Sequence, residues 1–127
     1  MYKLLILVFL TLPIWLQAQT SSERQQADSL TLQYYLNGQW DELLLTAQKA
    51  IAQNIDFKFL RQRMGYAYFM KGNYFASQKQ YEKALVFDPL DPGTLEYLYY
   101  CGLNTGNMIN ARFRSAALPD ELKEKYK

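Results

Sequence analysis

Histidine and cysteine, which often act as catalytic groups or metal ligands, are almost missing from this 127-residue sequence. It contains no histidine and a single cysteine, Cys101. A histidine base and histidine metal ligands are therefore excluded, and one thiol supplies neither an intrachain disulfide nor a cysteine metal cluster. Free cysteine usually packs as a small apolar residue, so we expect Cys101 to be buried in a helix; the alternative is an intermolecular disulfide in an oxidising compartment.

The carboxylates stand mostly where helices are expected to begin, at Asp41-Glu42, Asp88, Asp91 and Asp120-Glu121. At such positions they hydrogen-bond otherwise unpaired backbone amides or face the positive end of the helix dipole. We interpret them as capping residues rather than as a general acid and base. No glycine-rich phosphate loop is present. The sequence therefore predicts no catalytic residue, no bound metal and no cofactor.

Glycine recurs at an interval of 34 residues, at Gly38, Gly72 and Gly106. Flanking positions repeat with it, since a long apolar residue stands eight places before each glycine and an alanine stands twelve places after the first two. These flanking residues are Leu30, Met64, Leu98, Ala50 and Ala84. A period of this length is typical of repeats built from two antiparallel helices and a tight turn. The sequence contains no long run of period-two alternation that would predict a sheet.

The segment from Lys58 to Pro89 resembles the tetratricopeptide repeat (TPR). The residues that carry the resemblance are Gly65, Tyr68, Gly72, Tyr81, Ala84, Leu85 and Pro89. The segment before it is a looser match that keeps Leu30, Tyr34, Gly38, Ala50 and Ile51. The segment after it keeps Gly106 but departs most, with Tyr99 and Gly102 reversed in size relative to the pattern. Terminal repeats are commonly atypical in this way.

The resemblance implies an all-α fold, a superhelical solenoid of about three TPR units spanning residues 22–118. The units are expected at about 24–57, 58–91 and 92–118, followed by a C-terminal capping helix or tail at 119–127. The positions that build the repeats are Tyr34, Gly38, Gly65, Tyr68, Gly72, Tyr81, Ala84, Pro89 and Gly106. Among these, Tyr34, Tyr68 and Tyr81 are predicted to be core residues.

Local signals predict where each helix begins and ends. Ser22 and Gln25 form a capping box expected to open the first helix, which should end near Leu36. The second helix is expected at about 40–53. Asp56, Asn73, Asp91 with Pro92, and Asn107 are expected to open the next four, the third ending near Met70, the fourth near Phe87 and the fifth near Thr105.

The first nineteen residues have the layout of a secretory signal peptide. Lys3 supplies a positive charge, an apolar run extends from Leu4 to Leu16, and a polar exit follows. This apolar run is short for a membrane span, which needs roughly 20 residues. We expect cleavage near Ala18 or Gln19 and export to the periplasm or cell envelope, because the segment resembles bacterial signal peptides. An uncleaved anchor is the alternative.

The TPR resemblance also indicates a binding surface. In that family the first helix of each unit lines a concave groove, and the matching residues here are Leu32, Tyr35, Phe59, Gln62, Tyr66, Phe69, Tyr100 and Asn104. This groove is expected to be aromatic and nearly uncharged. The clamp with which some family members hold a terminal carboxylate is absent, because Asp28, Leu32, Gly93 and Tyr97 occupy the matching places. The alternative for the aromatic row is packing within the chain itself.

The charge balance argues against a nucleic-acid partner. The whole chain carries a formal charge of +2, and loss of Lys3 leaves 13 basic and 12 acidic side chains. Arg61 and Arg63 are expected on different helix faces, and Lys79 and Lys83 on a solvated flank, so no basic track forms.

These observations predict a non-enzymatic protein-interaction module of the bacterial cell envelope, binding a protein or peptide segment from an envelope or outer-membrane component. The alternative is a structural subunit, or the N-terminal module of a larger assembly, whose groove its own complex fills. A homo-oligomer is a further alternative.

Overall fold

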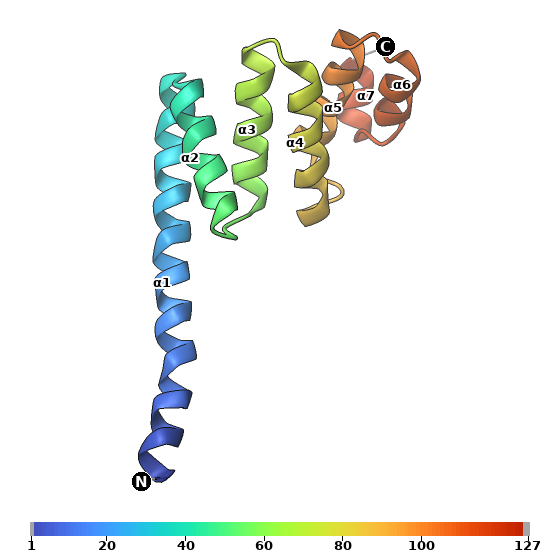
Figure 1. Cartoon of the computed structure of the whole chain (residues 1–127). Helices are drawn as coiled ribbons and strands as arrows, with labels where there is room; N and C mark the ends of the chain where they lie inside the picture. The colour runs from blue at the N-terminus through green and yellow to red at the C-terminus, as the bar shows by residue number, and fades with distance from the viewer. Residues whose placement is uncertain (1, 126–127) are drawn as a thin grey trace.

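The computed structural model describes residues 2–125, with side chains from Ala18 to Lys125. Every regular element in this part of the chain is a helix, which confirms the all-α prediction. The helices are α1 (Tyr2–Asn37), α2 (Trp40–Ala52), α3 (Lys58–Met70), α4 (Tyr74–Phe87), α5 (Pro92–Asn104), α6 (Met108–Ala116) and α7 (Asp120–Lys125). Consecutive helices pack side by side in a row from α1 to α6, and α7 lies at the α6 end (Figure 1).

The three periodic glycines form three equivalent turns, between α1 and α2, α3 and α4, and α5 and α6. Gly38, Gly72 and Gly106 have φ values of +67°, +77° and +72°, a region that glycine enters without steric strain. In each turn the amide after the glycine donates to the carbonyl four residues before the glycine, at 2.9 Å. The glycine amide itself donates to the carbonyl three residues back. This is the Schellman arrangement, so each glycine ends one helix and reverses the chain into the next.

Three of the predicted helix caps are confirmed. Asn73 accepts a hydrogen bond from the amide of Ala76 at 3.1 Å, and Asn107 accepts one from the amide of Asn110 at 3.0 Å. Asp91 accepts from the amide of Thr94 at 2.9 Å, with a proline at the following position. Each side-chain oxygen pairs an amide that the first turn of its helix leaves free.

Three predicted caps are wrong. Asp88 follows the C-terminal end of α4 and begins no helix. No helix begins at Ser22, because α1 runs without interruption from Tyr2 to Asn37 and no glycine or proline between Pro13 and Gly38 breaks it. Asp56 does not cap α3, whose N-cap is Phe57 and has no side-chain hydrogen bond. The Asp56 carboxylate instead binds the guanidinium of Arg61 through two hydrogen bonds of 2.8 and 2.6 Å.

The core lies between successive helices and combines large and small side chains. Leu43, Leu60 and Leu98 are fully buried, and Ala84 and Tyr81 are 0% and 3% exposed. The other predicted core tyrosines, Tyr34 and Tyr68, are only half-buried. Both pack against the core with one face, and the Tyr68 hydroxyl accepts a hydrogen bond from Gln48 at 3.3 Å. A tyrosine at a helix surface can bury its ring while its hydroxyl stays near water.

Gly65 makes the closest approach in this core. A Cβ atom at Gly65 would lie 2.7 Å from the ring of Tyr81, which is closer than real Cβ contacts. The missing side chain lets α3 and α4 approach until the Tyr81 ring lies against the α3 backbone. Pro89 is exposed two residues after the end of α4, where it does not interrupt the helix.

Candidate binding groove

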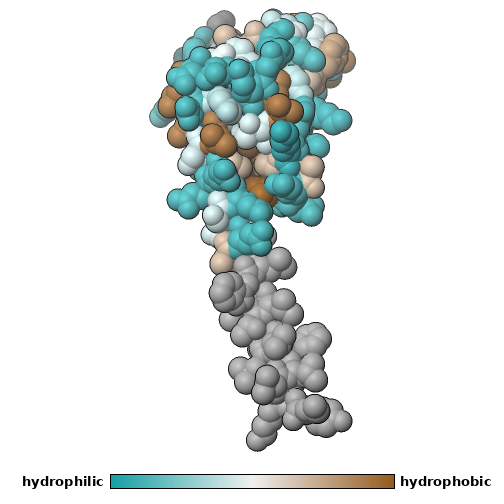
Figure 2. Space-filling view, turned by 60° about the vertical axis from the view of Figure 1, so that its left-hand side comes forward, coloured by the Kyte–Doolittle hydropathy of each residue, from teal (hydrophilic) through white to brown (hydrophobic). Residues whose placement is uncertain are grey.

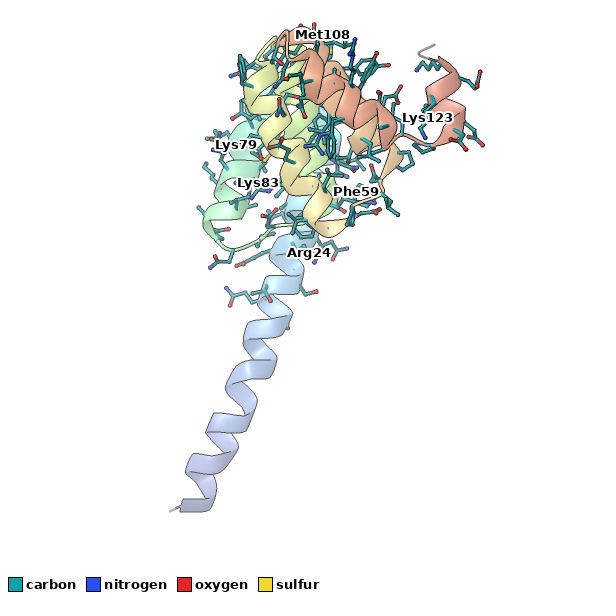
Figure 3. The ribbon with its side chains drawn as sticks, turned by 90° about the vertical axis from the view of Figure 1, so that its right-hand side faces the viewer. Arg24, Phe59, Lys79, Lys83, Met108 and Lys123 are labelled. Atoms are coloured by element: carbon teal, nitrogen blue, oxygen red, sulfur yellow. The ribbon has the colours of Figure 1, made fainter. Side chains whose placement is uncertain are left out.

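A hollow of about 330 Å³ lies on the side of the molecule formed by α1, α3 and α5. Its lining residues are Leu32, Tyr35, Phe59, Gln62, Arg63, Tyr66, Tyr81, Gly93 and Tyr97. Apart from Tyr81, all of them come from the first helix of an antiparallel pair. In Figure 3, Phe59 of this hollow lies on the opposite side of the molecule from Lys79 and Lys83 of α4.

The structure brings five of the eight predicted groove residues into this hollow, namely Leu32, Tyr35, Phe59, Gln62 and Tyr66. Phe69 and Tyr100 lie just beyond it, and both contact the ring of Tyr97. Asn104 does not line the hollow. Its side chain is exposed and donates to the carbonyl of Tyr100, one turn earlier in α5, at 2.8 Å.

Aromatic rings connect the three helix pairs across this side of the molecule. The ring of Tyr66 on α3 lies edge-on to Tyr35 on α1 at 5.1 Å and to Tyr97 on α5 at 5.5 Å, centroid to centroid. Phe69 lies 5.3 Å from Tyr97 and 5.1 Å from Tyr74. Edge-to-face pairs at such distances add stability beyond the burial of their area. The aromatic row therefore holds neighbouring pairs together as well as lining the hollow.

Tyr97 is the centre of this network, and the predicted groove does not include it. Its ring also stacks on the buried Tyr81 at 5.2 Å with an interplanar angle of 13°. The signal in the sequence is its position three residues before Tyr100, which places both on one face of a helix. Tyr97 joins the groove to the core.

One end of the groove carries charged side chains, contrary to the nearly uncharged surface expected. Arg63 Nη1 lies 2.6 Å from a carboxylate oxygen of Asp28 and 3.0 Å from the hydroxyl of Thr31. The exposed ring of Phe59 lies under two cations, with Lys58 Nζ at 5.0 Å and Arg63 Cζ at 5.9 Å from its centroid. The cations hold this ring at the rim of the hollow.

The other cation at this end is also neutralised within the chain. Lys58 Nζ lies 3.2 Å from Asp88 and 3.2 Å from Asp91, and the hydrogen bond with Asp91 is the main reason that the pKa of Lys58 is raised. Burial alone would raise the pKa of Asp91, but hydrogen bonds from Thr94 and Lys58 outweigh burial and lower it. Gln62 also donates to Asp91, at 2.7 Å. A ligand therefore meets aromatic rings and paired charges here rather than a free cation.

The hydroxyls of Tyr97 and Tyr81 stay protonated at neutral pH. Burial, reinforced by neighbouring tyrosines, raises the pKa of Tyr97 to about 12. Burial also raises the pKa of Tyr81. A protonated hydroxyl can both donate and accept a hydrogen bond, so Tyr97 can pair with a peptide backbone as well as offer its ring.

Two further polar groups lie inside the protein. Arg61, expected on a helix face, is only 5% exposed, and it donates to Gln80 at 2.7 Å in addition to its bonds with Asp56. Cys101 is fully buried, as predicted; its thiol lies 3.4 Å from the hydroxyl of Ser77, and burial raises its pKa. Neither group reaches the groove.

The described residues contain no group of three or more histidine, cysteine or carboxylate side chains that could hold a metal ion. Over the same part of the chain, no helix has the length and apolar character to cross a membrane. The expected signal peptide at 1–19 falls almost entirely on residues whose side chains lie outside the described part. No protein-family model matches this sequence, and a search of curated proteins found no match.

Proposed function

We propose that this protein is an exported TPR-type solenoid that binds a segment of another protein in the groove of α1, α3 and α5. The observation that carries the proposal is the hollow in which residues from the first helices of all three pairs converge. The repeated glycine turns support the TPR assignment because the same backbone arrangement occurs three times at the same interval.

Exposure divides the groove residues into two sets. Phe59 and Leu32 are 54% and 41% exposed, although both are large and apolar. Tyr66 and Tyr97 are half-buried and pack on rings from neighbouring pairs. A partner would therefore gain most binding free energy by covering the exposed apolar side chains of Phe59 and Leu32. The tyrosines form the floor of the hollow and offer their hydroxyls for hydrogen bonds.

The partner segment is expected to be apolar or aromatic and to carry no obligatory charge. Arg63 and Lys58 already have carboxylate partners, so an acidic ligand would have to displace Asp28 or Asp91. Separating a partly buried cation from its carboxylate costs more free energy than a new ion pair at the surface contributes. The same chemistry fits the alternative, in which a neighbouring subunit of a larger envelope assembly fills the groove permanently.

The test is to substitute the exposed residues and leave the floor intact. Leu32→Ala combined with Phe59→Ala should weaken partner capture by about 2 kcal/mol or more, which is the scale of an interface hot spot. Phe75→Ala on α4 is the matched control, because Phe75 is 74% exposed and lies outside the hollow. The readout is a pull-down from envelope extract with mass-spectrometric identification, alongside circular dichroism melting.

Two results would overturn the proposal. The first is a folded Leu32→Ala/Phe59→Ala variant that captures every protein the parent captures. The second is a parent that captures no protein above the level of a mock extract. An exchangeable partner supports an adaptor, whereas a partner that remains bound through purification and covers the groove supports the structural subunit.

A further inference from the structure

The end of the array formed by α5 and α6 repeats a surface that is used twice elsewhere in the chain. In the first helix pair, Tyr35 and Trp40 pack on Tyr66 of the next pair, with centroids 5.1 and 5.5 Å away. Thirty-four residues later, Phe69 packs on Tyr97 of the third pair at 5.3 Å, and Tyr74 supports Phe69 at 5.1 Å. The first of these two positions therefore packs on the following helix pair each time, and the second packs on that pair directly in the first case and supports the first position in the second case.

Another 34 residues along, these positions are Leu103 and Met108. They line a hollow of about 360 Å³ at the end of the array, together with Tyr99, Ala111, Arg112, Ser115, Ala116, Leu118 and Lys123. Leu103 is 38% exposed and Met108 53% exposed, whereas their counterparts in the first two pairs are half-buried. The third pair thus presents a stacking surface on which the described residues place no further helix pair.

The short helix α7 covers only one side of this surface. Lys123 of α7 reaches the hollow, and Lys125 Nζ binds Glu96 of α5 at 3.0 Å. Figure 3 views this end of the molecule and shows Met108 on α6 and Lys123 on α7 on either side of it. The apolar part near Leu103 and Met108 stays accessible to a partner.

We propose that a second copy of this chain occupies this surface in a two-fold dimer, with the α5–α6 end of one copy against the α5–α6 end of the other. A two-fold interface needs a self-complementary surface. Leu103, Met108 and Arg112 line the hollow, and exposed carboxylates lie at the start of the adjacent α7. Asp120 is one of these and pairs with Lys123 at 3.3 Å, and Glu121 is the other. Arg112 forms no ion pair within the described part of the chain, so a two-fold axis can bring it to the partner copy's α7 carboxylates.

The opposite end of the array argues against head-to-tail stacking. The exposed side chains of α1 include Gln25, Gln26, Ser29 and Gln33 beside the apolar Leu36, and the surface of this end is largely hydrophilic (Figure 2). Stacking that end on Leu103 and Met108 would bury amides against apolar side chains without partners for their hydrogen bonds. Pairing two like ends buries apolar surface on both copies. This inference does not depend on what fills the groove of α1, α3 and α5.

The test uses the protein as it is purified from cells. Its molar mass is measured by light scattering or sedimentation over a wide range of concentrations. The parent should be a dimer that dissociates to monomer on dilution. Met108→Glu should abolish the dimer, while Ile109→Glu should leave it intact, because Ile109 is 85% exposed on the same helix but does not line the hollow. Circular dichroism melting shows that both variants are folded.

Charge reversal supplies a second test, because substitutions at these exposed positions should leave the fold intact. Arg112→Glu should weaken the dimer by about tenfold or more, since it opposes like charges across the axis. Adding Asp120→Lys and Glu121→Lys to that variant should restore the dimer. A parent that stays monomeric at every concentration, an open-ended oligomer, or a dimer indifferent to Met108→Glu and Arg112→Glu would each overturn the inference.

Discussion

The rings of Tyr81 and Tyr97 stack across the boundary between α4 and α5, 5.2 Å apart and tilted by only 13°. Tyr81 is 3% exposed and fills the space that Gly65 leaves on α3, and it lines the hollow together with the half-buried Tyr97. One stacked pair therefore connects the packing of the second helix pair with the floor of the candidate binding surface. Damage to the core at Tyr81 should reach the groove through Tyr97.

Tyr81→Ala should lower the free energy of unfolding by about 3 to 5 kcal/mol, as for other buried large aromatic side chains. Tyr68→Ala should cost clearly less, because Tyr68 is half-buried and loses only one packed face and a hydrogen bond from Gln48. Urea denaturation followed by circular dichroism measures both. Equal losses for the two variants would mean that the buried Tyr81 contributes no more to stability than the half-buried Tyr68.

The raised tyrosine pKa values predict a loss of stability at alkaline pH. An ordinary tyrosine has a pKa of about 10, and that of Tyr97 in the folded chain is about 12. Between these values the folded state binds more protons than the unfolded state, so the free energy of unfolding falls as pH rises. Stability from this group is complete below about pH 10 and is lost on passing through about pH 12.

Thermal melts at a series of alkaline pH values should show this decline, and it should be smaller in Tyr97→Phe. The phenylalanine ring keeps most of the stacking on Tyr81 but has no proton to lose. Absorbance at the wavelength of the phenolate reports the ionisation directly. A Tyr97→Phe variant whose stability falls with pH as steeply as that of the parent would assign the effect to other groups.

The turns and most caps of this fold can be predicted from sequence because each depends on a few adjacent residues. Gly38, Gly72 and Gly106 meet a local backbone requirement, and Asn73, Asp91 and Asn107 each cap with their own side chain. Ser22 shows the limit of such signals. A capping residue favours a helix start, but it does not impose one where the preceding residues continue the helix.

The sequence predicts most of the residues that face the groove. It does not predict which of them are exposed at its rim and which are half-buried in its floor. Helical spacing places Phe59, Tyr66 and Phe69 on related faces of α3, yet Phe59 is exposed and the other two are half-buried. That difference depends on how each pair is rotated against the next, which a single helix does not encode. The burial of Arg61 has the same origin, since its partner Gln80 lies on another helix.

Removing the partner of Arg61 should destabilise the protein more than breaking a surface ion pair. Asp56→Ala leaves a buried guanidinium with two unpaired donors, which should cost about 1 to 3 kcal/mol. Asp41→Ala is the matched control. The Asp41 side chain is 80% exposed, and its ion pair with Lys71 should contribute between about 0 and 1 kcal/mol. Denaturation midpoints in low and high salt compare the two, and similar losses would contradict the role assigned to Asp56.

Gly72 provides a test of the repeated turn that is free of side-chain clashes. A Cβ atom at Gly72 would meet nothing within 4 Å, so any cost of substitution comes from its φ of +77°. Gly72→Val should destabilise by about 1 kcal/mol or more, and Gly72→Asn by less, because asparagine tolerates the left-handed region. Gly93→Ala is the control, at a position with only an ordinary contact of 3.6 Å and no positive φ. If Gly72→Val has the same melting temperature as the parent, the turn does not require glycine.

Removal of the expected signal peptide should leave the helical array intact. The first buried side chain described on α1 is Ala27, and the described residues from Ala18 to Gln26 are exposed or half-buried. A chain that begins near Gln19 or Thr20 therefore keeps every described core residue of α1, and we expect it to melt at the temperature of the uncleaved form. Intact-mass measurement on protein from an envelope extract identifies the N-terminus. A mass that retains Met1 to Ala18 would show an anchored protein instead, and a lower melting temperature after cleavage would show that the removed residues contribute to the array.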